Sequence, residues 1–333
     1  MPLRSCTRIT LTLGLAALAS GPAAAAPAAA QEPRVILLGT GTPNADPARS
    51  GPATAVLVGD RAFIVDAGPG VVRRAAAAAA KWSETGLTPP RLTTVLLTHL
   101  HSDHTLGLPD MLLSPWTLER TDPLVVIGPP GTRRLVTKLA EAFSADVDAR
   151  LGGLEPANRT GYRARVEESK GGVVYRDSLV TITAVPVPHA NWELAFAYRF
   201  DAGGWRALIS GDTRPAEAIV AACGGCDILV HEVYSAERLK DRPAEWQAYH
   251  RDAHTSTAEL AAIAARARPK LLVLTHQLFW GASGADLVEE IRAAGHSGAV
   301  VSGEDLDRFP GAERDAGAAG VQAPGNGSSA EGP

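Results

Sequence analysis

The chain has 333 residues, of which 45% are hydrophobic and 20% are charged. This composition supplies enough apolar side chains for the core of one large or two small globular domains. The formal net charge of −4 argues against a protein that grips a nucleic-acid backbone through its overall charge, so nucleic acid is an unexpected partner.

Residues 1–30 have the pattern of a secretory signal peptide. Arg4 and Arg8 come before an apolar run from Ile9 to Ala19, and the stretch ends in three alanines. A charged start, a short apolar middle and an Ala-x-Ala end are typical of a leader that is cleaved on export. We therefore expect a periplasmic or secreted protein with no membrane attachment after cleavage. An uncleaved anchor or an alanine-rich arm is the alternative.

Export would change both the charge and the cysteine content. Residues 1–30 hold two Arg and no acidic residue, which leaves 30 basic against 36 acidic residues, a formal charge of −6. Cys6 is lost with the leader, whereas Cys223 and Cys226 remain. In an oxidising compartment this pair can close a small disulfide loop. Two buried free thiols are the alternative, and a redox site is disfavoured because no thioredoxin-like context surrounds the pair.

Apolar strands alternate with helical stretches in the first half of the remaining chain. Strands are predicted over 35–38, 54–58, 62–66, 95–98 and 124–127. Helices are predicted over 71–82, 108–118 and 132–143. Residues 146–172 are polar and Gly-rich, and we expect them to form an insertion or an arm near the site.

The second half repeats this pattern. Strands are predicted over 179–187, 195–200, 205–210, 227–231, 271–275 and 299–302, and helices over 214–222, 257–268 and 286–294. Residues 311–333 are rich in Gly, Ala, Pro and Ser and are expected to be a disordered tail. Two halves of this kind predict two sheets packed face to face, with helix layers on both outer surfaces.

A cluster of metal-ligating side chains follows the strand at 95–98, in the sequence His99-Leu100-His101-Ser102-Asp103-His104. Because His99 and His101 alternate at a strand end, both side chains leave on the same side. One ion cannot easily use all four groups and keep a position open for chemistry, whereas two ions can share them. Imidazole and carboxylate without thiolate favour zinc, with manganese or iron as alternatives. A polar loop with capping histidines is the other interpretation.

Three further candidate ligands, His189, Asp212 and His276, each follow an apolar strand. Strand ends of this kind can converge at one rim of a sheet. Taken singly, each could equally be a capped or solvated strand end. Together with the cluster, they are numerous enough for two ions.

Further motifs accompany these candidate ligands. The full set is Leu38-Gly39-Thr40-Gly41, Val65-Asp66-Ala67-Gly68, the cluster at 99–104, His189 ahead of residues 196–200, Ser210-Gly211-Asp212-Thr213, His231-Glu232, His254-Thr255-Ser256 and Leu274-Thr275-His276. In this order and spacing, the motifs resemble the metallo-β-lactamase-fold hydrolases, and within them the branch shared by tRNase Z and the AtsA-type arylsulfatases. The resemblance implies an α/β fold in which a four-layer αββα sandwich of two mixed sheets, with helices outside, forms one hydrolase domain over residues 31–310.

The resemblance also implies a ligand set for two Zn²⁺, with Mn²⁺ or Fe²⁺ as alternatives. By position, the first ion is held by His99, His101 and His189, the second by Asp103, His104 and His276, and Asp212 bridges the two. Paired cations lower the pKa of bound water, so a metal-bridging hydroxide would exist at neutral pH and attack the ester.

Catalytic roles follow from the same resemblance. Asp103 can also orient the nucleophile, and His254, with Glu232 as its orienting partner, resembles the proton donor to the leaving oxygen. A histidine that only precedes the helix near residue 257 is the alternative for His254. Within the motifs, Asp66 and His231 are expected to support other groups rather than bind metal. His250 and His296, which lie outside the motifs, are expected to be surface residues.

The ligand set does not choose among esters. We expect an exported hydrolase of small sulfate or phosphate esters, arylsulfatase- or phosphodiesterase-like, because residues 301–307 resemble that branch and export and negative charge agree with it. The alternatives are a tRNA 3′-processing endonuclease, a lactonase or β-lactamase-like amidase, and a non-catalytic metal-binding protein. The endonuclease is disfavoured because residues 146–172 are not strongly basic and the leader separates the chain from tRNA. The oligomeric state stays open, and a homodimer is compatible with the sequence.

Overall fold

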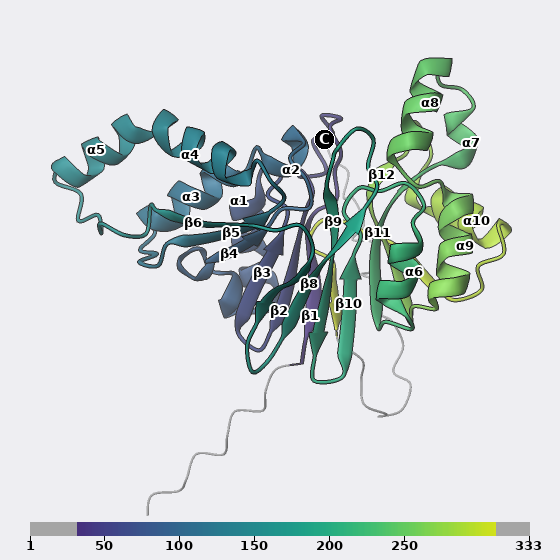
Figure 1. Cartoon of the computed structure of the whole chain (residues 1–333), viewed down its shortest axis with the longest axis horizontal. Coiled ribbons are helices and arrows are strands. Elements are labelled where there is room, and N and C mark those ends of the chain that lie inside the picture. Colours follow the sequence, from purple (N-terminus) through teal and green to yellow (C-terminus); the bar gives the residue numbers. More distant parts are fainter. Residues whose placement is uncertain (1–31, 311–333) are drawn as a thin grey trace, which may run out of the picture. The chain divides into compact units, whose positions relative to one another are not determined.

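Two seven-stranded mixed sheets lie face to face, and helices cover the outer surface of each (Figure 1). This computed structural model describes residues 32–310. The predicted leader over 1–30 and the predicted tail over 311–333 lie outside the described residues. The predicted αββα sandwich is confirmed. Within residues 32–310, no helix is long and apolar enough to cross a bilayer.

The first sheet contains the N-terminal strands and one strand from the end of the described chain. Its order is β14 (Arg308–Pro310), β1 (Arg34–Gly39), β2 (Ala53–Val58), β3 (Arg61–Val65), β4 (Thr94–Leu96), β5 (Leu124–Gly128) and β6 (Ala164–Glu168). Strands β3 to β6 run parallel to one another, and the other neighbours are antiparallel.

The second sheet mirrors this arrangement. Its order is β13 (Ala299–Ser302), β12 (Leu271–Leu278), β11 (Ile228–Tyr234), β10 (Trp205–Ile209), β9 (Ala195–Ala202), β8 (Thr181–Val187) and β7 (Gly172–Arg176). Strands β10 to β13 are parallel. In both sheets, the carboxyl ends of several parallel strands therefore point to one edge.

Helices close the two outer faces. The first sheet is covered by α1 (Val71–Trp82), α3 (Leu108–Thr117) and α4 (Thr132–Ala142), and the second by α6 (Glu217–Cys223), α9 (Thr257–Ala267) and α10 (Gly284–Ala293). Four more helices lie in connections: α2 (Ser102–Thr105), α5 (Ser144–Gly152), α7 (Ala236–Leu239) and α8 (Ala244–Ala253). Two short 3₁₀ turns, Thr85–Leu87 and Pro89–Arg91, follow α1.

Strand β1 shows why its sequence is continuously apolar rather than alternating. Val35 and Leu37 belong to the core between the two sheets, whereas Ile36 and Leu38 belong to the core beneath α1. Successive side chains of a strand point to opposite faces, and here both faces are buried. A strand covered on both sides needs apolar residues at every position.

Residues 146–172, expected to be an insertion or arm, contain most of α5 and all of β6. Strand β6 pairs in parallel with β5 and forms an edge of the first sheet. Most of its side chains are at least partly exposed, because an edge strand at the sheet margin has little to cover it.

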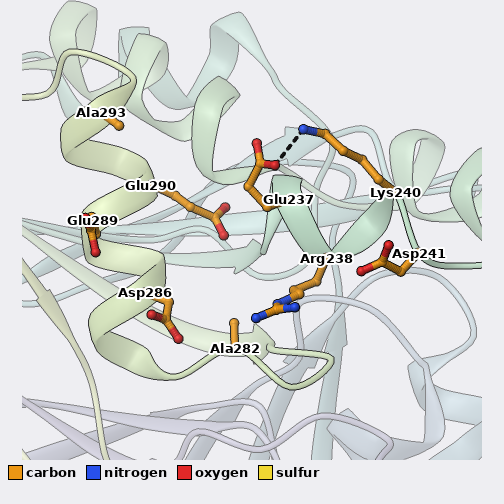
Figure 2. Close-up of a pocket in the computed structure, with 9 residues that line it drawn as sticks. All are labelled: Glu237, Arg238, Lys240, Asp241, Ala282, Asp286, Glu289, Glu290 and Ala293. Atoms are coloured by element: carbon orange, nitrogen blue, oxygen red, sulfur yellow. Dashed lines mark hydrogen bonds and ion pairs between the residues drawn. The ribbon is translucent and has the colours of Figure 1, made fainter.

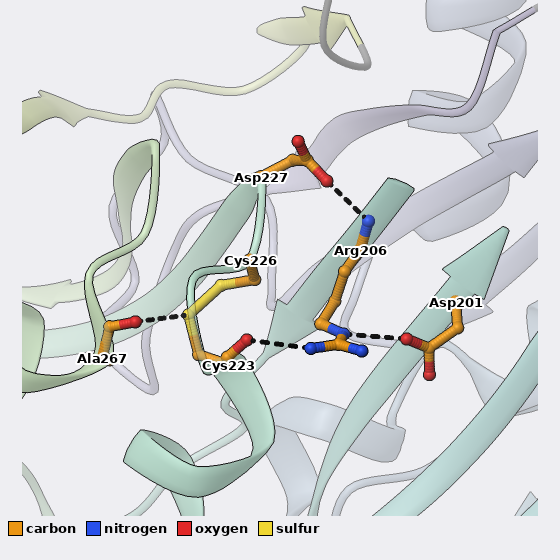
Figure 3. Close-up of a disulfide and its surroundings, with 6 residues drawn as sticks. All are labelled: Asp201, Arg206, Cys223, Cys226, Asp227 and Ala267. Atoms are coloured by element: carbon orange, nitrogen blue, oxygen red, sulfur yellow. Dashed lines mark hydrogen bonds and ion pairs between the residues drawn. A yellow bond between two sulfur atoms is a disulfide. The ribbon is translucent and has the colours of Figure 1, made fainter. Parts of the chain in front are cut away.

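A disulfide joins Cys223 and Cys226 (Figure 3). Cys223 ends α6, and Cys226 lies just before β11, so the bond ties the helix to the strand that follows it. Both sulfur-bearing residues are buried. Arg206 of β10 forms two hydrogen bonds next to the disulfide. Its guanidinium donates to the Cys223 carbonyl at 3.4 Å, and its backbone N–H donates to Asp227 at 2.7 Å. The structure therefore contains a disulfide at this pair rather than two free thiols.

Candidate metal centre

The seven predicted metal ligands meet at one edge of the two sheets. They are positioned by five segments: His99 and His101 follow β4, Asp103 and His104 lie in α2, His189 follows β8, Asp212 follows β10, and His276 lies in β12. All but His101 are buried. The carboxyl ends of strands are where ligands bind in open α/β sheets, and the sequence places each of these side chains at or near such an end.

A β-bulge aims His276 into this edge. In the pairing of β11 with β12, Thr275 is opposite Glu232 and Gln277 is opposite Val233, so His276 has no partner in the register. Its φ of 42° lies in the left-handed region. A bulge of this kind re-aims one side chain out of the regular alternation of a strand, and here it directs the imidazole toward the other ligands.

Two groups of side chains share Asp212. In the first group, His101 Nδ1 lies 2.9 Å from His99 Nε2 and 3.2 Å from His189 Nε2. In the second, Asp103 Oδ2 lies 3.4 Å from His104 Nε2 and 3.2 Å from His276 Nε2.

Asp212 completes both groups. Its Oδ2 lies 3.4 Å from His104 Nε2 and 3.5 Å from His276 Nε2. It also falls within 4.8 Å of the ligand atoms of His99, His101 and His189. A carboxylate that lies close to two sets of ligand atoms can provide a ligand to each.

These spacings fit divalent metal ions. Four ligand atoms at ~2.0–2.1 Å around zinc form a tetrahedron whose edges are roughly 3.4 Å, and the distances in the second group are 3.2–3.5 Å. His104 Nε2 and Asp212 Oδ1 are buried and have no hydrogen-bond partner among the described residues. Buried polar atoms are normally paired, so a cation would satisfy atoms that the protein leaves open.

The electrostatics of the first group favour the ligating forms of its side chains. Burial lowers the pKa of His99 well below its ordinary value and lowers that of His101 to about 4. Burial alone would raise the pKa of Asp212, but the neighbouring His276 and His104 hold it well below its ordinary value. Burial alone would lower the pKa of His104 and His276, but the carboxylates that face both rings raise it above the ordinary value. Because metal ions bind neutral imidazole and ionised carboxylate, a metal ion in the second group would displace protons from these two rings.

The second nitrogen of His99, His104 and His189 is held by a neighbour, whereas that of His276 has no hydrogen-bond partner among the described residues. His104 Nδ1 lies 2.8 Å from Asp66 Oδ2, and His189 Nδ1 lies 2.7 Å from the Ala253 carbonyl. Asp66, predicted to support other groups rather than bind metal, is therefore the neighbour that holds His104. Contacts of this kind fix the tautomer and ring orientation of a metal-bound histidine.

Trp192 contacts His101, and no motif in the sequence indicates it. Its indole Nε1–H donates to His101 Nε2 at 3.0 Å. A neutral imidazole that accepts at Nε2 carries its proton on Nδ1, the nitrogen that faces His99 and His189, so this contact opposes metal binding at Nδ1. Trp192→Phe keeps a ring but removes the donor, so we expect metal affinity to rise. Competition with a zinc-binding dye measures this change. An unchanged affinity would show that the indole N–H does not oppose metal binding.

His254 and Glu232 lie together beside the second group. His254 Nδ1 is 3.3 Å from Glu232 Oε1, which also accepts from the backbone N–H groups of Thr213 at 3.2 Å and Thr255 at 3.1 Å. Burial lowers the pKa of His254 to about 4 and raises that of Glu232 well above its ordinary value. Because His254 also forms a close group with Asp212 and His276, its position suits either a proton donor or a ligand.

A cavity of about 660 Å³ opens onto these residues. Five candidate site side chains line it, namely His101, Asp103, Asp212, His254 and His276. Its volume lies in the range of small-molecule and cofactor sites. The catalytic and ligand groups therefore face a space that can hold part of a substrate.

The same cavity also has an aromatic lining, which the sequence patterns did not indicate. Trp246, Tyr249 and His250 of α8 line the wall together with Trp280 beyond β12. The assignment of His250 and His296 to the surface is wrong, because these side chains are 7% and 6% exposed. Helical spacing was the available signal, since positions 246, 249, 250 and 253 share one face.

A second cleft lies between α7 and α10, on a different part of the surface (Figure 2). Its lining is charged and rich in carboxylates, including Asp286 and Glu289, with Glu237 paired to Lys240. Glu290 accepts hydrogen bonds from the Ser235 hydroxyl and the Ala236 N–H, so it fixes the start of α7. Among the described residues, no group with metal-ligand spacing occurs in this cleft.

Comparison with known proteins agrees with this geometry. A family model described as a beta-lactamase superfamily domain matches residues 61–277. Ribonuclease Z of Mycobacterium bovis is 36% identical over 280 residues, which cover 82% of this chain and 96% of the relative. Ribonuclease Z of Mycobacterium marinum is 35% identical over 278 residues, covering 82% of this chain and 97% of the relative.

Solved structures show the same fold at lower sequence identity. A metallo-beta-lactamase-fold protein of Bacillus subtilis superimposes with a TM-score of 0.64 at 17% identity, covering 84% of this chain and 99% of that protein. The short form of human tRNase Z superimposes with a TM-score of 0.61 at 21% identity, covering 83% and 98%.

Proposed function

Because the chain belongs to the beta-lactamase superfamily and, within it, to the ribonuclease Z family, and is a metal-dependent hydrolase of ester bonds, we propose that it cleaves a phosphodiester bond near the 3′ end of a tRNA-like RNA. The observation that carries this proposal is that Asp212 lines an open cavity and lies close to ligand atoms of both groups. Relatives that match along nearly their whole length support RNA as the substrate.

This proposal corrects two expectations. The expected activity on small sulfate or phosphate esters is wrong, and so is the expectation that nucleic acid is an unlikely partner, because the curated relatives are ribonucleases. The charge argument failed because net charge is an average over the whole surface. Two cations held by a local set of side chains create a positive site whatever the sign of the total.

For the metals, we propose two Zn²⁺ ions, held by the two groups of side chains and bridged by Asp212. Bound there, the ions would lower the pKa of a water molecule and stabilise negative charge on the phosphate oxygens. The ligand chemistry supports zinc, because the site offers imidazole and carboxylate and no thiolate.

The protein's own residues would then orient the substrate and supply a proton. Asp103, which is 3.2 Å from His276 Nε2, helps to fix the ligand geometry and to orient the nucleophile. We assign His254 as the donor to the leaving oxygen. Glu232 holds its Nδ1, so Nε2 is the nitrogen left for the substrate, and an anionic phosphate beside the ring favours its protonated form.

We also propose that the protein acts outside the cytoplasm, with residues 1–30 as the leader and residues 31–310 as the hydrolase domain. The disulfide between Cys223 and Cys226 supports this location, because disulfides persist in oxidising compartments. Its RNA substrate would then be RNA that has left the cytoplasm. Cell fractionation with thiol trapping tests this location, and a cytoplasmic protein with two free thiols would contradict it.

The zinc-loaded protein should cleave a 3′-extended tRNA transcript at one position, and treatment with EDTA should abolish the cleavage until zinc is restored. The metal ions carry the reaction, so a folded but metal-free chain lacks its main source of catalysis. Gel analysis of end-labelled RNA measures this. Bis(p-nitrophenyl) phosphate serves as the comparison substrate. Hydrolysis of that compound with no RNA cleavage would refute the RNA assignment while keeping the hydrolase.

A further inference from the structure

The aromatic wall, defined as Trp246, Tyr249, His250 and Trp280, lines the same cavity as five residues of the candidate site. We propose that it binds the base of the nucleotide next to the scissile phosphodiester by stacking, and that Arg242 beside it contacts the neighbouring phosphate. This inference rests on the proposed RNA substrate and specifies how that substrate is held.

The wall presents exposed rings that are already fixed in place. Among residues 32–310, three aromatic side chains are classed as exposed: Phe143, Trp246 and Tyr249. Trp246 and Tyr249, at 48% and 38% exposed, both belong to the wall. Exposed aromatic surface beside an open cavity indicates a binding surface.

His250 packs against two other rings of the wall, Trp246 and Trp280. Its imidazole is stacked on Trp246 at 5.8 Å with an interplanar angle of 26°, and it contacts Trp280 at 4.7 Å. Tyr249 stands at 90° to Trp246 with the ring centres 5.8 Å apart. Because this packing fixes the rings before any ligand arrives, little side-chain entropy is left to lose on binding.

Arg242 adds a positive charge at the same place. Its guanidinium lies 5.7 Å from the centre of the Trp280 ring, and among the described residues it forms no ion pair. Its buried Nε also lacks a hydrogen-bond partner within that part of the chain. An arginine with free donors suits a phosphate. Aromatic faces combined with a cation are the usual means of holding single-stranded nucleic acid.

The ligand of the wall follows from its position next to the metal centre. Tyr249 lies 6.1 Å from the ring of His254, the assigned proton donor, and both rings line one cavity. A phosphodiester at the ligand groups therefore places an adjoining base within reach of the wall. Stacking accepts any base, so the wall would hold the nucleotide without reading its sequence.

A binding experiment without turnover tests the wall directly. Calorimetry on the zinc-loaded protein compares AMP with ribose 5-phosphate, which has the same phosphate and no base. Stacking on one base predicts about tenfold tighter binding of AMP. The double variant Trp246→Ala/Tyr249→Ala should lose this preference, whereas Trp246→Phe/Tyr249→Phe should keep most of it. Equal affinities in the native protein, or no binding of AMP, would overturn the proposal.

Cleavage assays separate this proposal from the RNA assignment. With a 3′-extended tRNA transcript, the double alanine variant should raise KM about tenfold and leave metal content and Tm near the native values. Phe143→Ala is the matched control, since it removes an exposed ring between α4 and α5, and α5 lies on the opposite side of the molecule from α8 (Figure 1). This variant should leave KM unchanged. RNA cleavage with an unaltered KM in the double variant would refute base stacking on the wall and leave the proposed function intact. Absence of RNA cleavage by the native protein would refute the proposed function.

Discussion

Replacing Asp212 with alanine is expected to remove at least one of the two proposed metal ions and to lower turnover by about 10²–10³-fold or more. Asp212 is the single side chain that both ligand groups share, and it lies 3.4 Å and 3.5 Å from two ligand nitrogens of the second group. Its loss also leaves neighbouring imidazoles without the carboxylate that balances their charge. Metal analysis by mass spectrometry and RNA cleavage measure the two effects.

Two further variants make the Asp212 result specific. Asp212→Asn keeps the shape but removes the negative charge, so it should also lose metal if the alanine variant folds poorly. Asp227→Ala is the matched control, because Asp227 is also a buried aspartate but pairs with Lys270 and the Arg206 backbone away from the ligands. It should keep both ions. Two ions per chain in Asp212→Ala would contradict the bridging role.

His254→Ala is expected to keep the metal content near the native value and to lower RNA cleavage by about 10²–10⁴-fold, the usual contribution of a general acid. The loss should be much smaller with bis(p-nitrophenyl) phosphate, because p-nitrophenolate leaves without a proton. His296→Ala, at a buried histidine outside the cavity, should change neither rate.

The same variant decides between the two roles that the geometry allows for His254. Its close grouping with Asp212 and His276 also permits metal binding. Loss of one ion from His254→Ala would make the residue a ligand and would leave the proton donor unassigned. An equal loss of rate on both substrates would likewise argue against proton donation.

The ligand groups could be predicted because each side chain is tied to a local pattern. His99 and His101 alternate at the end of β4, and Asp212 follows an apolar strand, so the strand periodicity itself places them at the sheet edge. His276 was predicted in the same way, as the residue that follows the strand at 271–275, whereas the structure places it inside β12. Its side chain reaches the other ligands through a β-bulge, which no residue type in the sequence indicates.

The missed elements share a physical reason. Strands β6 and β7 are edge strands with few buried side chains, so their sequences lack the apolar pattern on which a strand prediction depends. Helix α8 buries only His250 and Ala253, and its aromatic residues face the cavity instead of the core. A hydrophobic pattern indicates the side chains that pack into a core. Helix α8 contributes few such side chains, so its sequence did not predict it.

The substrate was predicted wrongly because the ligand set is common to many esters. Whole-chain charge and a leader-like start pointed away from RNA, but neither describes the cavity. The features of this cavity that fit a nucleotide are Arg242 and the rings of α8, which come from segments without a strong sequence motif. Function in this fold is therefore better judged from the cavity wall than from the ligands.

Diffraction from crystals of the zinc-loaded protein, with anomalous data collected at the zinc absorption edge, tests the central claim most directly. We predict two zinc peaks per chain, one among His99, His101 and His189 and the other among Asp103, His104 and His276, with Asp212 contacting both. A single peak, or zinc bound elsewhere while these side chains stay unliganded, would contradict the paired-metal centre on which the proposed RNA cleavage depends.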